Sequence, residues 1–297
     1  MIIDNIEGGI GDDVMEVFSP PRVVNIAKRS GLRAGHSIDK LVEKAPGVPW
    51  DLRKRSHQNE VIAIVERTKP GLLIGSPPCT WFSRMMQVSW SRISKDRRKK
   101  MLAEARGYLR FMCRLYKLQH KAGRMFLHEH PDGATSWAEE EVQEILKLSG
   151  VVRSTLDMCA YGLWTHGSSG CGLALKTTGI ITNNAHFSRH LSRRCSGDHD
   201  HIALNGGTRT AQAAIYTESF CEATVEGYKK HGCLNPPKPH RNLSERDGWD
   251  SANLLEIGAD DPEDLGGYHD GESAQIEDAM EYELFEASEE ADNDIVA

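Results

Sequence analysis

The sequence predicts an α/β protein with one doubly wound, mostly parallel sheet of Rossmann-like type and helices on both faces. Short apolar runs alternate with segments whose apolar residues recur every three or four positions, up to about residue 230. This alternation favours βαβ units, whose crossover helices make the strands parallel. A length of 297 residues suits one large α/β domain or two small ones.

Apolar spacing and chain breakers set the expected elements. Proline lacks a backbone donor, so the Pro-Pro pairs at 20–21 and 77–78 mark two strand ends. Gly31 would end the first helix. We expect strands at 15–18, 36–39, 71–75, 124–129, 152–156 and 177–182, and helices over 22–30, 59–67, 96–122, 137–148 and 211–230.

Composition changes near Pro236, where packing signals fade. Residues 241–297 hold nineteen acidic side chains and two arginines, which leaves 34 basic and 24 acidic side chains in residues 1–240. We therefore expect an N-terminal extension over 1–13, a folded domain over 14–235, and an acidic, disordered tail or linker to another domain over 236–297. A basic body suits a polyanionic partner, although the tail also fits a simple solvated linker.

The location expected from the sequence is intracellular. The seven cysteines are unevenly spaced, and the N-terminus shows no signal pattern. No stretch reaches eighteen apolar residues, so we expect no membrane partner.

The run from Leu72 to Ser83 places one thiol on a stiff loop after an apolar strand. Gly75 ends the strand, Pro77 and Pro78 fix the backbone, and Cys79 follows. Loops at the carboxyl ends of strands bind ligands in such sheets, so Cys79 is a candidate nucleophile. The alternative is a buried cysteine behind a turn, since free cysteine is often buried.

This run resembles the nucleophile motif of cytosine-C5 DNA methyltransferases, about Gly-Gly/Ser-Pro-Pro-Cys-Gln-x-Phe-Ser, from which Thr80 departs. In that family the thiolate attacks C6 of a flipped-out cytosine, and C5 takes a methyl group from S-adenosylmethionine. The base must leave the stack because C6 is shielded in a duplex. The resemblance implies that Cys79 is the nucleophile and that Pro78 lies beside the cofactor.

Further motifs follow in the family's order over residues 14–230. Phe18 matches the strand end before the cofactor loop, Asp39 the acid that binds the cofactor ribose, and Asp51 the acid near the adenine. Tyr161-Gly162 matches a later motif. The helix expected over 211–228 could replace the family's last helix, which closes the cofactor pocket.

Glu129 matches the glutamate that holds the target base and helps protonate its N3. Addition at C6 builds negative charge on the pyrimidine, and a carboxylic acid at N3 relieves it. Desolvation near an apolar strand end would help such an acid keep its proton. The alternative is an exposed carboxylate at a strand end.

The sequence departs from the family pattern in several places. The loop Phe18–Arg22 has no glycine, which elsewhere lets the backbone approach the cofactor. His130 replaces an asparagine. No Gln-Arg-Arg follows Tyr161, and Lys176 is the nearest basic substitute. The chain is most similar to divergent methyltransferase-like domains in retroelement polyproteins of unicellular algae.

These observations lead to one function and two alternatives. The leading interpretation is S-adenosylmethionine-dependent methyl transfer to cytosine C5 in DNA, which suits a nuclear location. One alternative is a non-catalytic nucleic-acid-binding domain of a retroelement polyprotein. The other is a different cysteine-nucleophile enzyme, which would need His128 or His130 beside Cys79.

A basic segment follows the cysteine, where the family has a mobile DNA-contacting loop. Residues 84–124 hold thirteen Lys/Arg and two acids, and such a cluster would neutralise phosphates. A solvated helix face is the alternative. The candidate nucleic-acid contacts are Ser83, Arg84, Lys95, Arg97, Arg98, Lys99, Lys100 and Lys176.

A segment dense in metal-ligand types lies between residues 186 and 201. Structural zinc takes four Cys or His ligands, and Cys159 or Cys171 could join the set. Surface histidines are the alternative interpretation. The candidate zinc ligands are His186, His190, Cys195, His199 and His201.

Overall fold

The computed structural model describes residues 11–167, 170–204 and 207–232. The chain divides into two compact units. Within the described residues, the larger unit contains 11–162, 177–196 and 216–232, and the smaller contains Leu163–Lys176 and Gly197–Ile215. The expected tail over 236–297 and most of the expected N-terminal extension lie outside the described residues.

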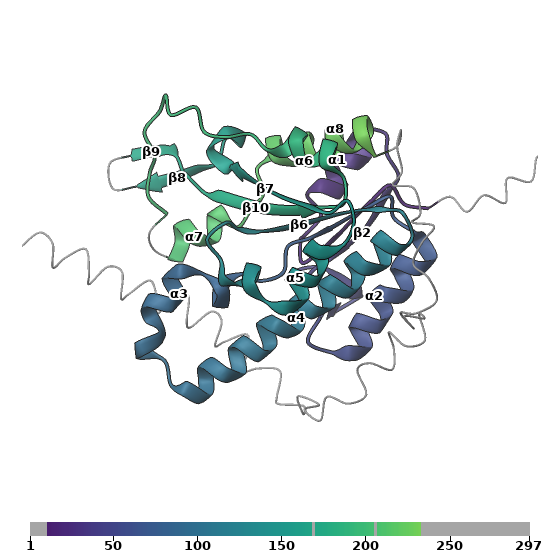
Figure 1. The fold of residues 1–297 in the computed structure, drawn as a ribbon, viewed down its shortest axis with the longest axis horizontal. Coiled ribbons are helices and arrows are strands. Elements are labelled where there is room, and N and C mark those ends of the chain that lie inside the picture. Colours follow the sequence, from purple (N-terminus) through teal and green to yellow (C-terminus); the bar gives the residue numbers. More distant parts are fainter. Residues whose placement is uncertain (1–10, 168–169, 205–206, 233–297) are drawn as a thin grey trace, which may run out of the picture. The chain divides into compact units, whose positions relative to one another are not determined.

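The larger unit contains a six-stranded sheet with the order β2-β1-β5-β6-β10-β7 (Figure 1). The first four strands in this order are parallel to one another. β10 is antiparallel to both of its neighbours, β6 and β7. The predicted α/β fold with a mostly parallel sheet is therefore confirmed. The strands are β1 (Val14–Val17), β2 (Ala34–Ile38), β5 (Leu72–Gly75), β6 (Met125–Pro131), β7 (Val152–Asp157) and β10 (Thr177–Thr182).

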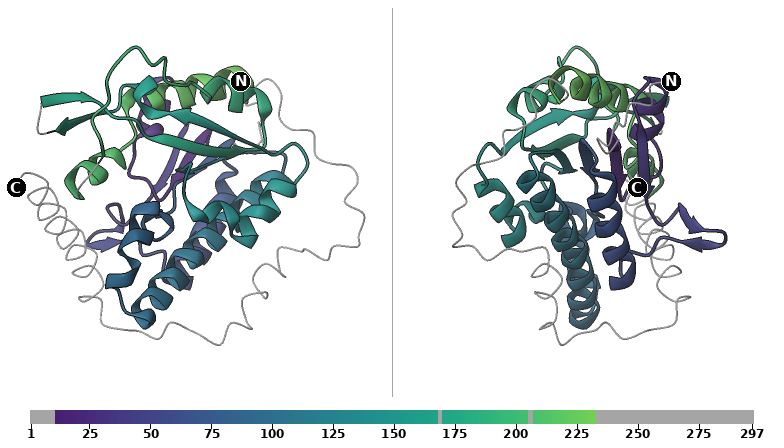
Figure 2. Two further views of the ribbon diagram at one scale, coloured as in Figure 1. Left: turned by 60° about the vertical axis from the view of Figure 1, so that its left-hand side comes forward. Right: turned by 90° about the vertical axis from the view of Figure 1, so that its right-hand side faces the viewer.

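Helices cover both faces of this sheet, as predicted. α1, α6 and α8 pack together on one face, while α2, α4 and α5 lie on the other (Figures 1 and 2). A parallel strand covered on both faces is apolar along its whole length, and all four residues of β5 are buried. The helices are α1 (Val23–Arg29), α2 (Arg55–Thr68), α4 (Lys95–Lys121), α5 (Glu140–Lys147), α6 (Ala185–Leu191) and α8 (Glu218–His231).

Two expected helices differ from the observed ones. The segment expected over 137–148 begins as a 3₁₀ turn, Thr135–Ala138, before α5. The single helix expected over 211–230 is wrong, because α7 (Gly207–Ala213) ends before Thr217 starts α8. The Thr217 hydroxyl accepts from Phe220 N at 3.2 Å, as an N-cap does. The sequence also did not predict α3 (Arg84–Ser89), α6, or the hairpin of β3 (Glu43–Ala45) and β4 (Val48–Pro49).

The smaller unit contains α7 and a hairpin of β8 (Trp164–Gly167) and β9 (Gly170–Leu173). Backbone hydrogen bonds join Ala174 N to Leu163 O and Ile202 N to Leu173 O. The Ile202 side chain packs on Gly172, where a β-carbon would lie only 3.2 Å from it. In the part of the chain that the structure describes, no helix has the length and apolar character needed to cross a membrane.

Candidate active site and metal cluster

One row of residues runs across the four parallel strands and defines the carboxyl edge of the sheet. Ile38 and Gly75 both lie opposite Val17, and His128 lies opposite Gly75. The residues that follow this row along the chain are Asp39, Phe18, Ser76 and Glu129. Three of the predicted site residues thus follow a single row. The strand order reverses direction between β1 and β5, and such switch points are where ligands bind in open α/β sheets.

Cys79 lies half-buried on the loop after β5, between two anchored segments. Ahead of it, the carbonyl oxygen of buried Pro77 accepts a hydrogen bond from His130 Nε2 at 2.8 Å. After it, Phe82 is buried in a 3₁₀ turn, and its carbonyl oxygen accepts from Thr135 Oγ1 at 3.3 Å. These contacts give the Cys79 loop a defined path, as the Pro-Pro pair predicts.

His130 has both ring nitrogens in hydrogen bonds. Nδ1 lies 2.6 Å from Ser136 Oγ, and Nε2 lies 2.8 Å from Pro77 O. A carbonyl oxygen only accepts, so Nε2 carries the hydrogen and, in the neutral ring, Nδ1 accepts from the Ser136 hydroxyl. His130 and Ser136 are almost fully buried. The histidine therefore ties β6 to the Cys79 loop, a role that the sequence did not reveal.

Tyr216 links the Cys79 loop to Glu129. Its hydroxyl donates to Glu129 Oε2 at 3.2 Å and also contacts Ser76 Oγ. Burial, together with the nearby Glu129 charge, raises the pKa of Tyr216 well above its ordinary value, so the phenol keeps its proton. Glu129 is only 6 % exposed, so the alternative of an exposed strand-end carboxylate is wrong. The sequence does not reveal the role of Tyr216, which lies 87 residues from Glu129.

His128 precedes Glu129 in β6 and is fully buried. Its Nδ1 is 3.0 Å from the hydroxyl of Tyr116, which donates to Gly75 O at 3.3 Å. Burial, followed by the neighbouring His130, lowers the pKa of His128 well below its ordinary value. His128 is therefore a neutral, buried support for the end of β5.

A buried carboxylate closes the turn between β1 and α1, where the family has a glycine-rich loop. Glu16 Oε1 accepts from Arg22 N at 2.8 Å and from Val24 N at 3.1 Å, and Oε2 accepts from Ser19 Oγ at 2.8 Å. Burial raises the pKa of Glu16, although these hydrogen bonds oppose the rise. Beside it, Phe18 has a φ of 58°, which is rare for an aromatic residue.

The two predicted cofactor acids lie in different environments. Asp39 Oδ1 accepts from Leu41 N at 2.9 Å, and burial raises the pKa of Asp39. Asp51 accepts two hydrogen bonds from the guanidinium of Arg53, at 2.9 and 3.0 Å. Burial opposes ionisation of Asp51, but Arg53 and then Lys54 outweigh it, so the pKa of Asp51 is lowered. The Asp51 carboxylate is thus held in an ion pair with Arg53.

The basic segment after Cys79 forms α3, a 3₁₀ turn (Trp90–Arg92) and α4. Ser83 accepts from Met86 N at 3.2 Å and so caps α3. Farther along α4, Arg106 pairs with Glu139 at 2.9 Å and Lys117 with Glu144 at 2.7 Å. The predicted nucleic-acid contacts lie at the start of α4, before these ion pairs. Lys95, Lys99 and Lys100 are exposed, and Arg97 and Arg98 are half-buried.

The remaining predicted contacts have local partners. The Arg98 guanidinium lies 5.9 Å from the Trp90 ring centroid. Arg84 is exposed and lies beside Gly133. Pro78, which the resemblance places beside the cofactor, is exposed. In the smaller unit, Lys176 Nζ donates to Ala213 O at 3.1 Å, near the end of α7.

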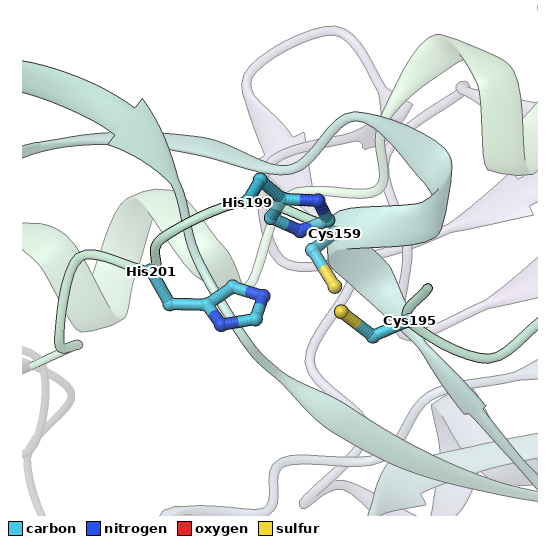
Figure 3. A group of neighbouring side chains, drawn as sticks. All are labelled: Cys159, Cys195, His199 and His201. Atoms are coloured by element: carbon cyan, nitrogen blue, oxygen red, sulfur yellow. The ribbon is translucent and has the colours of Figure 1, made fainter. Parts of the chain in front are cut away.

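Two cysteines and two histidines gather in one cluster. The ligand atoms of Cys159, Cys195, His199 and His201 all lie within 4.8 Å of one another (Figure 3). Three of these residues were predicted zinc ligands, and Cys159 was one of two residues expected to join them. Burial, followed by the neighbouring Cys195, raises the pKa of Cys159 to about 11.

The other predicted ligands do not belong to this cluster. His186 and His190 lie on α6, with ring centroids 5.9 and 5.8 Å from that of His231. Cys171 Sγ lies 2.8 Å from His166 Nδ1 in the β8–β9 hairpin. The α6 histidines therefore lie beside His231 of α8 rather than in the cluster.

Comparison of the chain with protein-family models and with curated proteins finds no match.

Proposed function

We propose that the chain transfers a methyl group from S-adenosylmethionine to C5 of cytosine in DNA, with Cys79 as the nucleophile and Glu129 as the acid at N3. The observation that carries the proposal is the Tyr216 hydroxyl, which contacts both Ser76 in the Cys79 loop and Glu129. A thiol and a buried carboxyl at the ends of two neighbouring strands form the pair that addition to C6 requires. The sheet, with its one antiparallel strand, would then be of the methyltransferase type.

The residues divide the chemistry between them. The Cys79 thiolate forms a bond to C6, and the electron pair displaced from the ring is accommodated as Glu129 delivers its proton to N3. Because the Tyr216 hydroxyl donates to Oε2, the transferable proton belongs on Oε1. S-adenosylmethionine, when bound, supplies an electrophilic methyl group on its sulfonium. Water then takes the C5 proton, the Cys79 thiolate leaves C6, and N3 returns its proton to Glu129, which restores the aromatic ring and the carboxylic acid.

The residues near the switch point fit a nucleoside cofactor without phosphates. Glu16 already accepts hydrogen bonds from Arg22 N and Val24 N. These two amides, at the turn into α1, are therefore not available to bind a phosphate group. A dinucleotide would need such amides for its pyrophosphate, whereas S-adenosylmethionine carries none. Asp39 follows β2, where an acid would bind the ribose hydroxyls. Asp51 would contribute less, because Arg53 holds it.

The glycine-free β1–α1 turn favours one alternative, a non-catalytic nucleic-acid-binding domain. Pro20 and Pro21 restrict the backbone where a cofactor would need a close approach. The alternative of a different cysteine-nucleophile enzyme finds less support. It needs a histidine to act as the base for Cys79, but His130 uses its ring nitrogens on Pro77 and Ser136, and His128 is buried against Tyr116.

Trapping with 5-fluorocytosine tests the proposal. Fluorine at C5 blocks the proton loss that resolves the adduct, so the full chain with S-adenosylmethionine should form a covalent complex with a 5-fluorocytosine duplex. Cys79→Ser should abolish this complex, because a hydroxyl is a far weaker nucleophile at neutral pH. Cys171→Ser, which removes an exposed thiol from the hairpin, is the matched control and should trap normally.

Two outcomes would contradict the proposal. A chain that binds both DNA and S-adenosylhomocysteine yet never traps would rule out Cys79 as the nucleophile. A chain that binds DNA but gives no calorimetric signal with S-adenosylhomocysteine would favour the non-catalytic alternative.

A further inference from the structure

The cluster of Cys159, Cys195, His199 and His201 has the size and the donor atoms of a metal site. In a tetrahedral zinc site the bonds are about 2.3 Å to sulfur and about 2.0–2.1 Å to nitrogen, so ligand atoms lie roughly 3.3–3.8 Å apart. The four ligand atoms here lie within 4.8 Å of one another before any ion is considered. A contraction of about 1 Å, within the reach of side-chain rotation, would complete the coordination.

Neighbouring carboxylates already orient the ligands. His199 Nδ1 lies 2.8 Å from Asp198 Oδ1, and since a carboxylate only accepts, this nitrogen carries the hydrogen and Nε2 is the one that can bind a metal. Asp157 Oδ2 accepts from Cys195 N at 2.9 Å and from Arg194 Nε at 3.0 Å. Asp157 precedes Cys159 by two residues, so this buried carboxylate holds together the two segments that carry the thiols.

We propose that these four side chains bind one zinc ion with a structural role. Two thiolates and two imidazoles fill all four positions of a tetrahedral site and leave none open for a reacting molecule, which is the pattern of structural zinc. Soft thiolates also disfavour Mg²⁺ and Ca²⁺, which take oxygen ligands. Binding would release the protons of both thiols, so zinc affinity should fall as the pH is lowered.

The site is specific within the described residues. Among residues 11–167, 170–204 and 207–232, no second group of three or more Cys, His, Asp or Glu side chains meets the same distance criterion. The pair His166 and Cys171 and the α6 histidines offer the same residue types without the fourfold arrangement. They therefore supply matched controls.

Metal analysis of the full chain tests this proposal independently of methyl transfer. Protein purified under reducing conditions with added zinc and then dialysed should retain about one zinc ion per chain. Cobalt replacing zinc should give thiolate-to-cobalt charge-transfer absorption and the intense visible bands of a tetrahedral site. His201→Gln and Cys195→Ser should each weaken zinc binding at least about tenfold, whereas Cys171→Ser and His186→Gln should bind as the unmodified chain does.

Three results would overturn the proposal. The first is a folded, unmodified chain that retains no zinc and gives no cobalt bands. The second is full zinc retention by both His201→Gln and Cys195→Ser. The third is a disulfide between Cys159 and Cys195, found by mass spectrometry under the same reducing conditions. Far-UV circular dichroism of His201→Gln, which changes a half-exposed side chain, separates loss of a ligand from loss of the fold.

Discussion

The carboxyl edge of the sheet is built differently on the two sides of its switch point. On the nucleophile side, formed by the Cys79 loop and the end of β6, uncharged donors hold the loop. His130 Nε2 donates to Pro77 O, while the Tyr216 hydroxyl donates to the Glu129 carboxylate and contacts the Ser76 side chain. On the cofactor side, formed by the β1–α1 turn with Asp39 and Asp51, carboxylates make the turns. Glu16 alone accepts from two backbone amides of that turn.

The difference separates a loop held by uncharged donors from a turn held by a carboxylate. In the Cys79 loop, Ser76 contacts the Tyr216 hydroxyl, and burial raises the pKa of Tyr216 well above its ordinary value, so this support stays neutral. The β1–α1 turn has no glycine, and a buried carboxylate stabilises it instead. A buried carboxylate is costly to ionise, so the stability of the cofactor side should depend on pH through Glu16.

The largest effect is expected from His130→Ala on the nucleophile side. The change leaves Pro77 O and Ser136 Oγ buried without their partner and opens a cavity, so unfolding should become easier by about 2–4 kcal/mol. Urea denaturation measures this loss. His186→Ala, at an exposed position on α6, is the control and should cost less than about 1 kcal/mol. Equal losses in the two variants would show that His130 does not support the loop.

The two acids of the cofactor side should respond differently to substitution. Asp39→Asn should weaken S-adenosylhomocysteine binding by about 1–3 kcal/mol, the usual effect of losing a charged hydrogen-bond partner. Asp51→Asn should weaken it by less than about 1 kcal/mol, because this carboxylate is already paired with Arg53. Isothermal titration calorimetry distinguishes the two. A larger effect at Asp51 would reverse the assignment.

A smaller effect, on DNA binding, is expected from charge reversal near the start of α4. Lys99→Glu should weaken DNA binding, and the slope of log affinity against log salt should decrease by about 0.9 if one phosphate contact is lost. Lys117→Glu changes the same charge beside Glu144 and should alter the slope less. Fluorescence anisotropy at several salt concentrations makes the comparison. Identical slopes for both variants would place the DNA contact elsewhere.

The smallest effect concerns pH and Glu16. Burial raises the folded-state pKa of Glu16 above its ordinary value of 4.5. Its contribution to stability is therefore fully present below pH 4.5 and is lost as the pH rises through the folded-state pKa. The unmodified chain should thus lose stability relative to Glu16→Gln as the pH rises over this interval. Paired denaturation curves measure the difference, and one that does not vary with pH would contradict this account.

The sequence predicted those elements whose signal is local. Residues 177–182 form β10 within the predicted bounds, and 96–122 differ from α4 by one residue at each end. The position of β10 between β6 and β7 is not a local property, and neither periodicity nor turn chemistry reveals it. Residues 211–230 look like one helix because their apolar spacing continues through Thr217, which instead caps a new helix.

The same difference between local and long-range signals applies to the candidate site. Cys79 and Glu129 are visible in the sequence because each follows an apolar strand. Their supports are not visible, since Tyr216 and His130 contact residues 87 and 53 positions away. The metal cluster was predicted in part, because Cys195, His199 and His201 are close in sequence, while Cys159 joins them through the fold.

The insertion of β10 has a consequence for the order in which the sheet can form during synthesis. β7 has β10 as its neighbour in the sheet, and β10 is the last of the six strands to leave the ribosome. Until residues 177–182 are available, one side of β6 and both sides of β7 lack a strand partner. Unpaired edges are the surfaces on which growing chains misassociate. A nascent chain that pauses between residues 157 and 177 should therefore need a chaperone more than a chain paused after residue 182.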